Sequence, residues 1–150
     1  SYVRANTHKL GIDPAFYKKI DIHVHVPAGA IPKDGPSAGV AMITALVSLI
    51  TNKPVKDKLG MTGEISLRGN VLPIGGLKEK STAAHRSGLT HILAPAQNEK
   101  DLVDIPKKVL KDLKISFVKD VSEVLKLALG LEGKKPPKSQ KTQSVITAEA

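Results

Sequence analysis

Cysteine and tryptophan are absent from the 150 residues, and the aromatic side chains are limited to two Tyr and two Phe. The lack of cysteine excludes a disulfide framework, a thiolate metal site and a cysteine nucleophile. With so few aromatic residues, a surface on which nucleic-acid bases stack is not expected. No apolar run is long enough to cross a bilayer core of about 30 Å. We therefore predict a soluble protein with no membrane partner, compatible with the cytoplasm.

The composition and charge of the chain favour one globular domain. With 41% hydrophobic and 25% charged residues, a chain of this length buries roughly 70% of its surface on folding. The formal net charge of +9 invites a nucleic-acid interpretation, because Lys and Arg bind phosphate by releasing counterions. The basic residues are spread along the chain rather than clustered, so weak nucleic-acid binding is the most that the charge predicts.

The chain divides into a folded part and a tail. Residues 1–130 carry the apolar segments, whereas residues 131–150 are polar and rich in Pro and Lys, which predicts a disordered basic tail. The first residues, Ser1-Tyr2-Val3-Arg4, resemble the middle of a helix. We therefore expect the chain to be a piece of a longer protein.

Three segments lead into the first long helix. From Ile20 to Val26 the apolar side chains share one face and the polar ones, including His23 and His25, share the other, which predicts a half-buried strand. Pro and Gly residues predict a loop at 27–35. Residues 36–50 then predict a helix that is apolar on nearly all sides and buried on most of them.

The rest of the chain alternates between strand-like and helix-like segments. We expect strands at Leu59–Leu67, Val71–Ile74, His91–Ala94 and Ile115–Val118, with the first two joined as a hairpin by residues 68–70. We expect helices at Leu77–Ser87 and Val121–Leu129. Between them we expect a short helix capped by Asn98 and another that begins at Pro106. This alternation predicts an α+β fold, a mixed α/β sheet with helices packed on it.

Ser37 lies in the most informative segment, which reads Pro32-Lys33-Asp34-Gly35-Pro36-Ser37-Ala38-Gly39. The serine is predicted in the first turn of a buried helix, among small residues that leave room for a substrate carbonyl. Backbone N–H groups at a helix start stabilise negative charge, so Ser37 is a candidate nucleophile with an oxyanion site beside it. A serine here also commonly does no more than satisfy the helix start, and the segment alone leaves both interpretations open.

A serine nucleophile needs a base, and Lys80 is a better candidate than the histidines, which have no obvious carboxylate partner. In the predicted helix at residues 77–87, Lys80 shares a side with Leu77 and Ala84, whereas Lys78 faces polar residues. Burial and the positive end of the helix dipole both disfavour the ammonium form, which makes a neutral amine available as the base. The same segment also fits a lysine whose ammonium reaches solvent.

Other possible sites are weaker. His23 and His25 would share a strand face and could hold a metal, but no third ligand is signalled, so we predict no metal site. Asp34 and Glu64 could act as a carboxylate pair, yet their spacing does not single them out. The phosphate-loop pattern is absent, which predicts that this chain does not hydrolyse ATP by itself.

Four segments together resemble the proteolytic domain of bacterial Lon proteases: Ile22–Pro27, Pro32–Gly39, Met61–Gly69 and Gly75–Lys80. The resemblance covers residues 3–129 in order. It implies a serine endopeptidase with a serine–lysine dyad, in which Ser37 matches the nucleophile and Lys80 the general base. It also implies supporting residues: Thr62 holding the lysine amine, Gly35 and Pro36 beside the oxyanion site, and His23, His25 and Glu64 lining or bordering the active site. We count Asp34, which precedes Gly35, among the supporting residues as well.

The resemblance further implies a parent protein with parts that this chain lacks. Those parts are the N-terminal portion of the proteolytic domain and an ATPase module that uses ATP and Mg²⁺. The parent would be a cytoplasmic homo-hexamer that degrades misfolded and regulatory polypeptides. Ser81 and Thr82 depart from the family, where a more apolar pair stands. Two alternatives remain open: a basic nucleic-acid-binding module, and a ring-forming scaffold without activity.

Overall fold

The computed structural model describes residues 1–25 and 36–131. The loop predicted at 27–35 and the disorder predicted for 132–150 lie outside the described residues. The N-terminal part forms α1 (Tyr2–Ala5), α2 (Thr7–Leu10) and the 3₁₀ helix η1 (Phe16–Lys18). The other elements follow in the order α3 (Gly39–Thr51), β1 (Leu59–Met61), β2 (Glu64–Ile65), β3 (Val71–Leu72), α4 (Leu77–Arg86), β4 (His91–Pro95), the 3₁₀ helix η2 (Ala96–Asp104), α5 (Lys107–Asp112), β5 (Lys114–Val118) and α6 (Val121–Leu129).

The strands form two separate sheets. β1, β4 and β5 lie parallel in the order β1-β4-β5, with Leu59 opposite His91 and His91 opposite Lys114. β2 and β3 pair as an antiparallel hairpin, so the hairpin predicted across residues 68–70 is confirmed. The predicted fold class, mixed α/β with helices packed on the strands, is confirmed as well.

The single strand predicted over Leu59–Leu67 is wrong, because the chain leaves the parallel sheet in the middle of that run. After β1, the backbone N–H of Gly63 donates to the carbonyl of Ser37, and the backbone carbonyl of Gly63 accepts from the N–H of Val40. These bonds go to the start of α3 and not to a neighbouring strand. They end β1 and turn the chain towards the hairpin.

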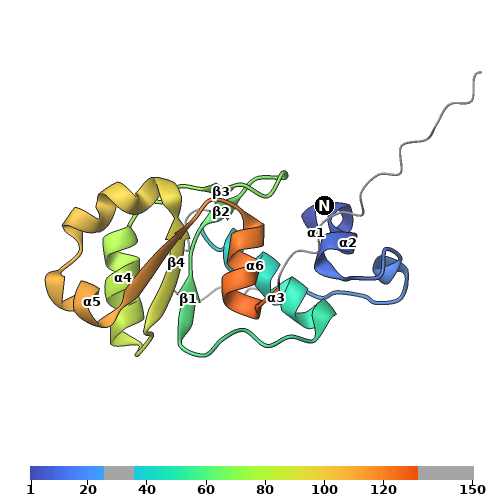
Figure 1. The fold of residues 1–150 in the computed structure, drawn as a ribbon, viewed down its shortest axis with the longest axis horizontal. Helices are drawn as coiled ribbons and strands as arrows, with labels where there is room; N and C mark the ends of the chain where they lie inside the picture. Colours follow the sequence, from blue (N-terminus) through green and yellow to red (C-terminus); the bar gives the residue numbers. More distant parts are fainter. Residues whose placement is uncertain (26–35, 132–150) are drawn as a thin grey trace, which may run out of the picture.

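Helices cover both faces of the parallel sheet (Figure 1). α4 and α5 lie on one face, and α3 and α6 lie on the other. Alternate residues of β4 pack into the apolar clusters on the two faces of the sheet, because successive side chains of a strand point to opposite faces. Leu93 packs in the cluster of α3 and α6, whereas Ile92 and Ala94 pack in the cluster of α4 and α5. Three strands therefore separate two apolar layers.

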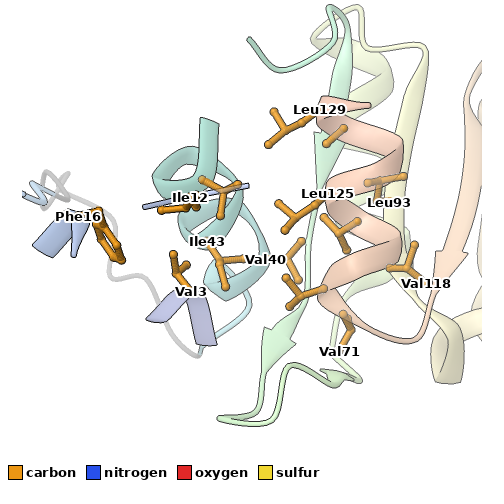
Figure 2. Close-up of a cluster of buried hydrophobic side chains, with 14 residues drawn as sticks. Val3, Ile12, Phe16, Val40, Ile43, Val71, Leu93, Val118, Leu125 and Leu129 are labelled. Atoms are coloured by element: carbon orange, nitrogen blue, oxygen red, sulfur yellow. The ribbon is translucent and has the colours of Figure 1, made fainter. Parts of the chain in front are cut away.

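The larger layer continues past α3 to the N-terminal helices (Figure 2). Figure 2 shows it extending from Leu125 on α6, through Val40 and Ile43 on α3, to Val3 and Phe16. α3 is therefore packed between α6 on one side and the first residues of the chain on the other. The N-terminal segment and the C-terminal helix share one core.

α3 is exposed along one side. Val40 and Val47 are fully buried, but Met42 and Leu49 are 47% and 69% exposed. The described residues cover the two sides of α3 that face α6 and the N-terminal helices, and no described element covers the side of Met42 and Leu49. The helix is therefore buried or half-buried on most sides, as predicted, and exposed on the one side that carries Met42, Ala45 and Leu49.

Residues 20–25 form no strand, although the sequence alternates there. Ile22 and Val24 are 39% and 61% exposed. A strand needs a neighbour that accepts and donates its backbone hydrogen bonds, and no described strand pairs with this segment. The prediction of a half-buried strand is therefore wrong for the described part, and Val26 lies outside it.

The ends of α6 agree with the sequence because they depend on local signals. The Asp120 side chain accepts hydrogen bonds from the backbone N–H groups of Ser122 at 2.8 Å and Glu123 at 3.1 Å. Gly130 ends the helix with φ 66°, a conformation that favours glycine. Pro106 precedes α5 as predicted.

Asn98, in contrast, does not cap a helix as predicted. It lies inside η2, whose N-cap is Pro95 and has no side-chain cap. The Asn98 amide instead binds the backbone of Ile74, which lies 24 residues away in the sequence. A tertiary partner has replaced the local one.

Ser81 on α4 is an unfavourable residue for its position. It is fully buried, and its hydroxyl has no hydrogen-bond partner among the described residues. A buried unpaired hydroxyl costs about 1–3 kcal/mol. We expect Ser81→Ala to raise the free energy of unfolding by about 1 kcal/mol, measured by calorimetric or urea unfolding.

The matched control is Ser48→Ala on α3, whose hydroxyl donates to the Lys53 carbonyl at 2.6 Å. The same substitution there removes a hydrogen bond, so stability should fall. A decrease in stability for Ser81→Ala would contradict the assignment of Ser81 as an unsatisfied group.

Candidate active site

Ser37 lies just before α3, not in its first turn as predicted. Ala38 is the N-cap and α3 begins at Gly39. The backbone N–H of Gly39 donates to the carbonyl of Pro36 at 3.1 Å, which closes a turn around Ser37. Ser37 is half-buried and Pro36 is exposed. Pro36 therefore supplies the carbonyl of a turn rather than the first residue of the helix.

The main chain of Ser37 is fixed to the end of β1. Its carbonyl accepts hydrogen bonds from the N–H of Gly63 at 2.9 Å and from the hydroxyl of Thr62 at 3.4 Å. The N–H of Val40 donates to the carbonyl of Gly63 at 3.0 Å. Thr62 is itself buried, and its N–H donates to Leu93 of β4 at 3.0 Å. The turn that presents Ser37 is therefore held by the parallel sheet.

Glycine is required where this turn meets the sheet. A Cβ on Gly63 would lie 2.7 Å from Cγ2 of Val40 and 2.9 Å from Cγ1 of Val71. A Cβ on Gly39 would lie 3.2 Å from both Cγ1 and the backbone N of Ile65. The start of α3 packs directly against the backbone of residues 63–65, with no space for further side chains.

Lys80 lies in the first turn of α4. Gly76 is the N-cap with φ 69°, and its carbonyl accepts from the N–H of Lys80 at 3.0 Å. Leu77 is 2% exposed and fixes this turn in the core. Lys80 is half-buried while Lys78 is exposed, so the prediction that Lys80 is the lysine on the inner side of the helix is confirmed.

The topology places both candidate groups at the carboxyl end of the parallel strands. Ser37 is bonded to Thr62 and Gly63, which directly follow β1. α4 begins after Ile74, which is bonded to Asn98, three residues past the end of β4. Ligands of open α/β sheets bind at this end of the strands. Within the described residues, no hydrogen bond joins the Ser37 hydroxyl to the Lys80 amine.

The other predicted site residues are only partly gathered here. Glu64 is half-buried in β2, directly after Gly63. His23 and His25 are exposed in the segment that pairs with no described strand. Asp34 and Gly35 lie outside the described residues. Within 1–25 and 36–131, no group of three His, Asp or Glu side chains could hold a metal ion.

The prediction that no histidine has an obvious carboxylate partner is wrong for His85. Its Nε2 lies 3.0 Å from Oδ2 of Asp112, which joins the last turn of α4 to the end of α5. Their separation of 27 positions hid the pair from sequence reasoning. This pair lies at the opposite end of α4 from Lys80, so it does not belong to the Ser37 site.

His91 is a second histidine with a close partner, again away from the site. Its Nε2 lies 2.8 Å from the hydroxyl of Ser116 on the neighbouring strand. Burial, with smaller contributions from Lys114 and Lys56, lowers the pKa of His91 below its usual value. His91 begins β4, so the pair lies near the amino ends of the parallel strands, opposite the end that carries Ser37.

Sequence reasoning missed the contact of Gly63 with the Ser37 carbonyl and the contact of Asn98 with Ile74. The signal for Gly63 was its place within a strand-like run, where glycine marks a close backbone approach. Nothing local marked Asn98, because its partner Ile74 comes much earlier in the chain. As for membranes, no helix of the part that the structure describes has the length and hydropathy to span a bilayer.

Comparison with known proteins identifies relatives of the whole described region. Residues 1–131 match the family described as the Lon protease (S16) C-terminal proteolytic domain. Lon protease 1 of Bacillus subtilis (strain 168) is 60% identical over 129 residues, which are 86% of this chain and 17% of that protein. Lon protease of Escherichia coli (strain K12) is 63% identical over 127 residues, 85% of this chain and 16% of that protein. The chain thus spans about one sixth of the length of these relatives.

Proposed function

Because the chain belongs to the family of Lon protease C-terminal proteolytic domains, we propose that it hydrolyses peptide bonds through a serine–lysine dyad. Ser37 is the nucleophile and Lys80 the general base. The observation that carries the proposal is the double hydrogen bond on the Ser37 carbonyl, from Gly63 and Thr62. These two hydrogen bonds fix the turn that contains Ser37 to the carboxyl end of the parallel sheet, where α4 also begins.

In the proposed reaction, the neutral Lys80 amine takes the hydroxyl proton of Ser37 as its oxygen attacks the peptide carbonyl. The tetrahedral intermediate collapses to an acyl-enzyme, and Lys80 returns the proton to the leaving amine. Lys80 next takes a proton from water, which attacks the acyl group, and the acid product leaves as Ser37 regains its proton. Each half-reaction therefore returns Lys80 to its neutral form, and the second also restores the hydroxyl of Ser37.

Backbone N–H groups beside Ser37 supply the oxyanion site in this proposal. Neither Ser37 nor Ala38 donates its N–H to a backbone carbonyl of a described residue. These donors precede the helix α3, whose positive end adds to the stabilisation of a developing negative charge. Ala38 is exposed and carries only a methyl group, so a substrate carbonyl has room to approach there.

The position of Lys80 supports its role as the base. Lys80 is half-buried in the first turn of α4, on the side of the helix that also carries the buried Leu77 and Ala84. In this proposal Thr62 holds the lysine amine, and its hydroxyl lies at the Ser37 carbonyl.

At the level of the whole protein, we propose that this domain works within an ATP-dependent protease. ATP and Mg²⁺ would act in a separate ATPase module, and the substrates would be polypeptides, including misfolded and regulatory proteins. The subunits would assemble as a homo-hexamer in the cytoplasm. Residues 1–130 would form the proteolytic part and residues 131–150 a basic tail.

A covalent probe tests whether the hydroxyl of Ser37 is activated as a nucleophile. In the full-length protease, a fluorophosphonate should modify Ser37, located by peptide mass spectrometry, because an activated serine oxygen attacks phosphorus. Ser37→Ala should abolish the modification, while Ser87→Ala, at an exposed serine after α4, should leave it intact. A protein that hydrolyses ATP but is not modified at Ser37 would support an inactive scaffold instead.

A further inference from the structure

The buried side chain of Asn98 makes three hydrogen bonds. It is 3% exposed. Its amide nitrogen donates to the carbonyl of Ile74 at 2.8 Å, and its amide oxygen accepts from the N–H of Ile74 at 3.0 Å. The second amide hydrogen goes to the carboxylate of Asp101 at 2.6 Å. All three bonds would be lost if the amide were rotated by 180°, so Asp101 fixes the orientation in which Asn98 holds Ile74.

Ile74 is the last fixed residue before α4. Two glycines, Gly75 and Gly76, separate it from Leu77, the first helical residue. Both are exposed, and a Cβ on Gly75 would have no atom within 4 Å, so this turn gains no rigidity from packing. The direction in which α4 starts is therefore set by Asn98 before the glycines and by the buried Leu77 after them.

Asn98 also connects α4 to β4, the strand that holds Thr62. β4 ends at Pro95, and Asn98 follows in the rigid turn of η2. Within β4, the carbonyl of Leu93 accepts from the N–H of Thr62, whose hydroxyl binds the Ser37 carbonyl. β4 thus holds Thr62, which binds the Ser37 carbonyl. Through Asn98, β4 also holds the start of α4, the helix that contains Lys80.

We propose that Asn98 is a positioning residue, which sets the Lys80 amine relative to the Ser37 hydroxyl by holding Ile74. This proposal rests on the proposed function. Asn98 touches neither the substrate nor the reacting atoms. Its effect should therefore appear in the rate of the chemical step, because a displacement of about 1 Å of a catalytic group can lower a rate 100-fold, and not in the binding of peptide.

The test compares Asn98→Ala with Val124→Ala in the full-length protease. Val124 is a fully buried residue of α6 on the other face of the sheet, so its truncation is a control for lost stability. For Asn98→Ala we expect kcat for peptide hydrolysis to fall at least about tenfold, with KM changed less than about twofold. Val124→Ala should keep kcat within about twofold at temperatures well below its unfolding.

Asp101→Ala is a milder second variant in case Asn98→Ala fails to fold. It frees the Asn98 amide without removing it, so kcat should fall by about two- to fivefold, again with KM unchanged. Equal kcat in the Asn98→Ala, Asp101→Ala and Val124→Ala proteins would overturn the positioning role. Unchanged hydrolysis by Ser37→Ala would instead overturn the proposed function, so the two failures are distinguishable.

Discussion

Lys80→Ala in the full-length protease is expected to lower peptide hydrolysis by at least about a thousandfold, while ATP hydrolysis stays within about twofold of the parent. Without the amine, the proposed reaction has no base to accept the Ser37 proton. Ser37→Ala should give a loss of similar size. The double variant should be no worse than either single one, because residues that act as a unit are not additive.

Two further variants separate a base from a positive charge. Lys80→Arg keeps the charge and most of the length, but a guanidinium does not release its proton in proteins, so this variant should also be inactive. Lys78→Ala, at the exposed lysine two residues earlier on α4, should retain activity. Peptide and ATP hydrolysis would be measured on the same preparations. An active Lys80→Arg protein would end the assignment of Lys80 as the base.

Gly63→Ala has the second largest expected effect, and it acts on stability and activity together. The added Cβ would lie within 3 Å of Val40 on α3 and Val71 on β3, so the start of α3 must move away from the strand. Overpacking of this kind costs about 2–3 kcal/mol, which lowers Tm by roughly 10 °C for a domain of this size. The same movement breaks the bonds that hold the Ser37 carbonyl, so peptide hydrolysis should also fall sharply.

The control for this substitution is Gly75→Ala. Its Cβ would have no atom within 4 Å and its backbone is outside the left-handed region, so alanine fits there without strain. The Tm of Gly63→Ala should therefore lie below the Tm of Gly75→Ala by nearly the whole decrease expected for Gly63→Ala. A Gly63→Ala protein as stable as Gly75→Ala would show that α3 and β1 approach less closely than the structure has them.

The sequence predicted the elements whose signals are local. Local residues mark the ends of two helices. Asp120 and Gly130 mark the ends of α6, and Gly76 and Gly88 mark the ends of α4. The choice of Lys80 over Lys78 followed from helical periodicity alone. These features need no knowledge of where the rest of the chain lies.

Three of the wrong predictions concern residues whose hydrogen-bond partners are distant in the sequence or missing from the described residues. The strand at 59–67 is interrupted because Gly63 bonds Ser37, 26 positions before it. Asn98 was predicted as a cap because the bond to Ile74 is not visible in the order of residues. The segment at 20–25 has the alternation of a strand but no neighbour among the described residues. In each case a tertiary hydrogen bond, made or missing, outweighs a local preference.

The register of β1 against β4 sets the distance between the proposed catalytic residues Ser37 and Lys80. Met61 lies opposite Leu93, and Thr62 is bonded to the same residue. A slip of one residue along this pair would carry Thr62 by about 3.3 Å and turn its side chain to the other face of the sheet. Insertions in the turns at the far end of the strands leave that spacing intact, whereas a single residue gained or lost between Leu59 and Gly63 would part the serine from the lysine.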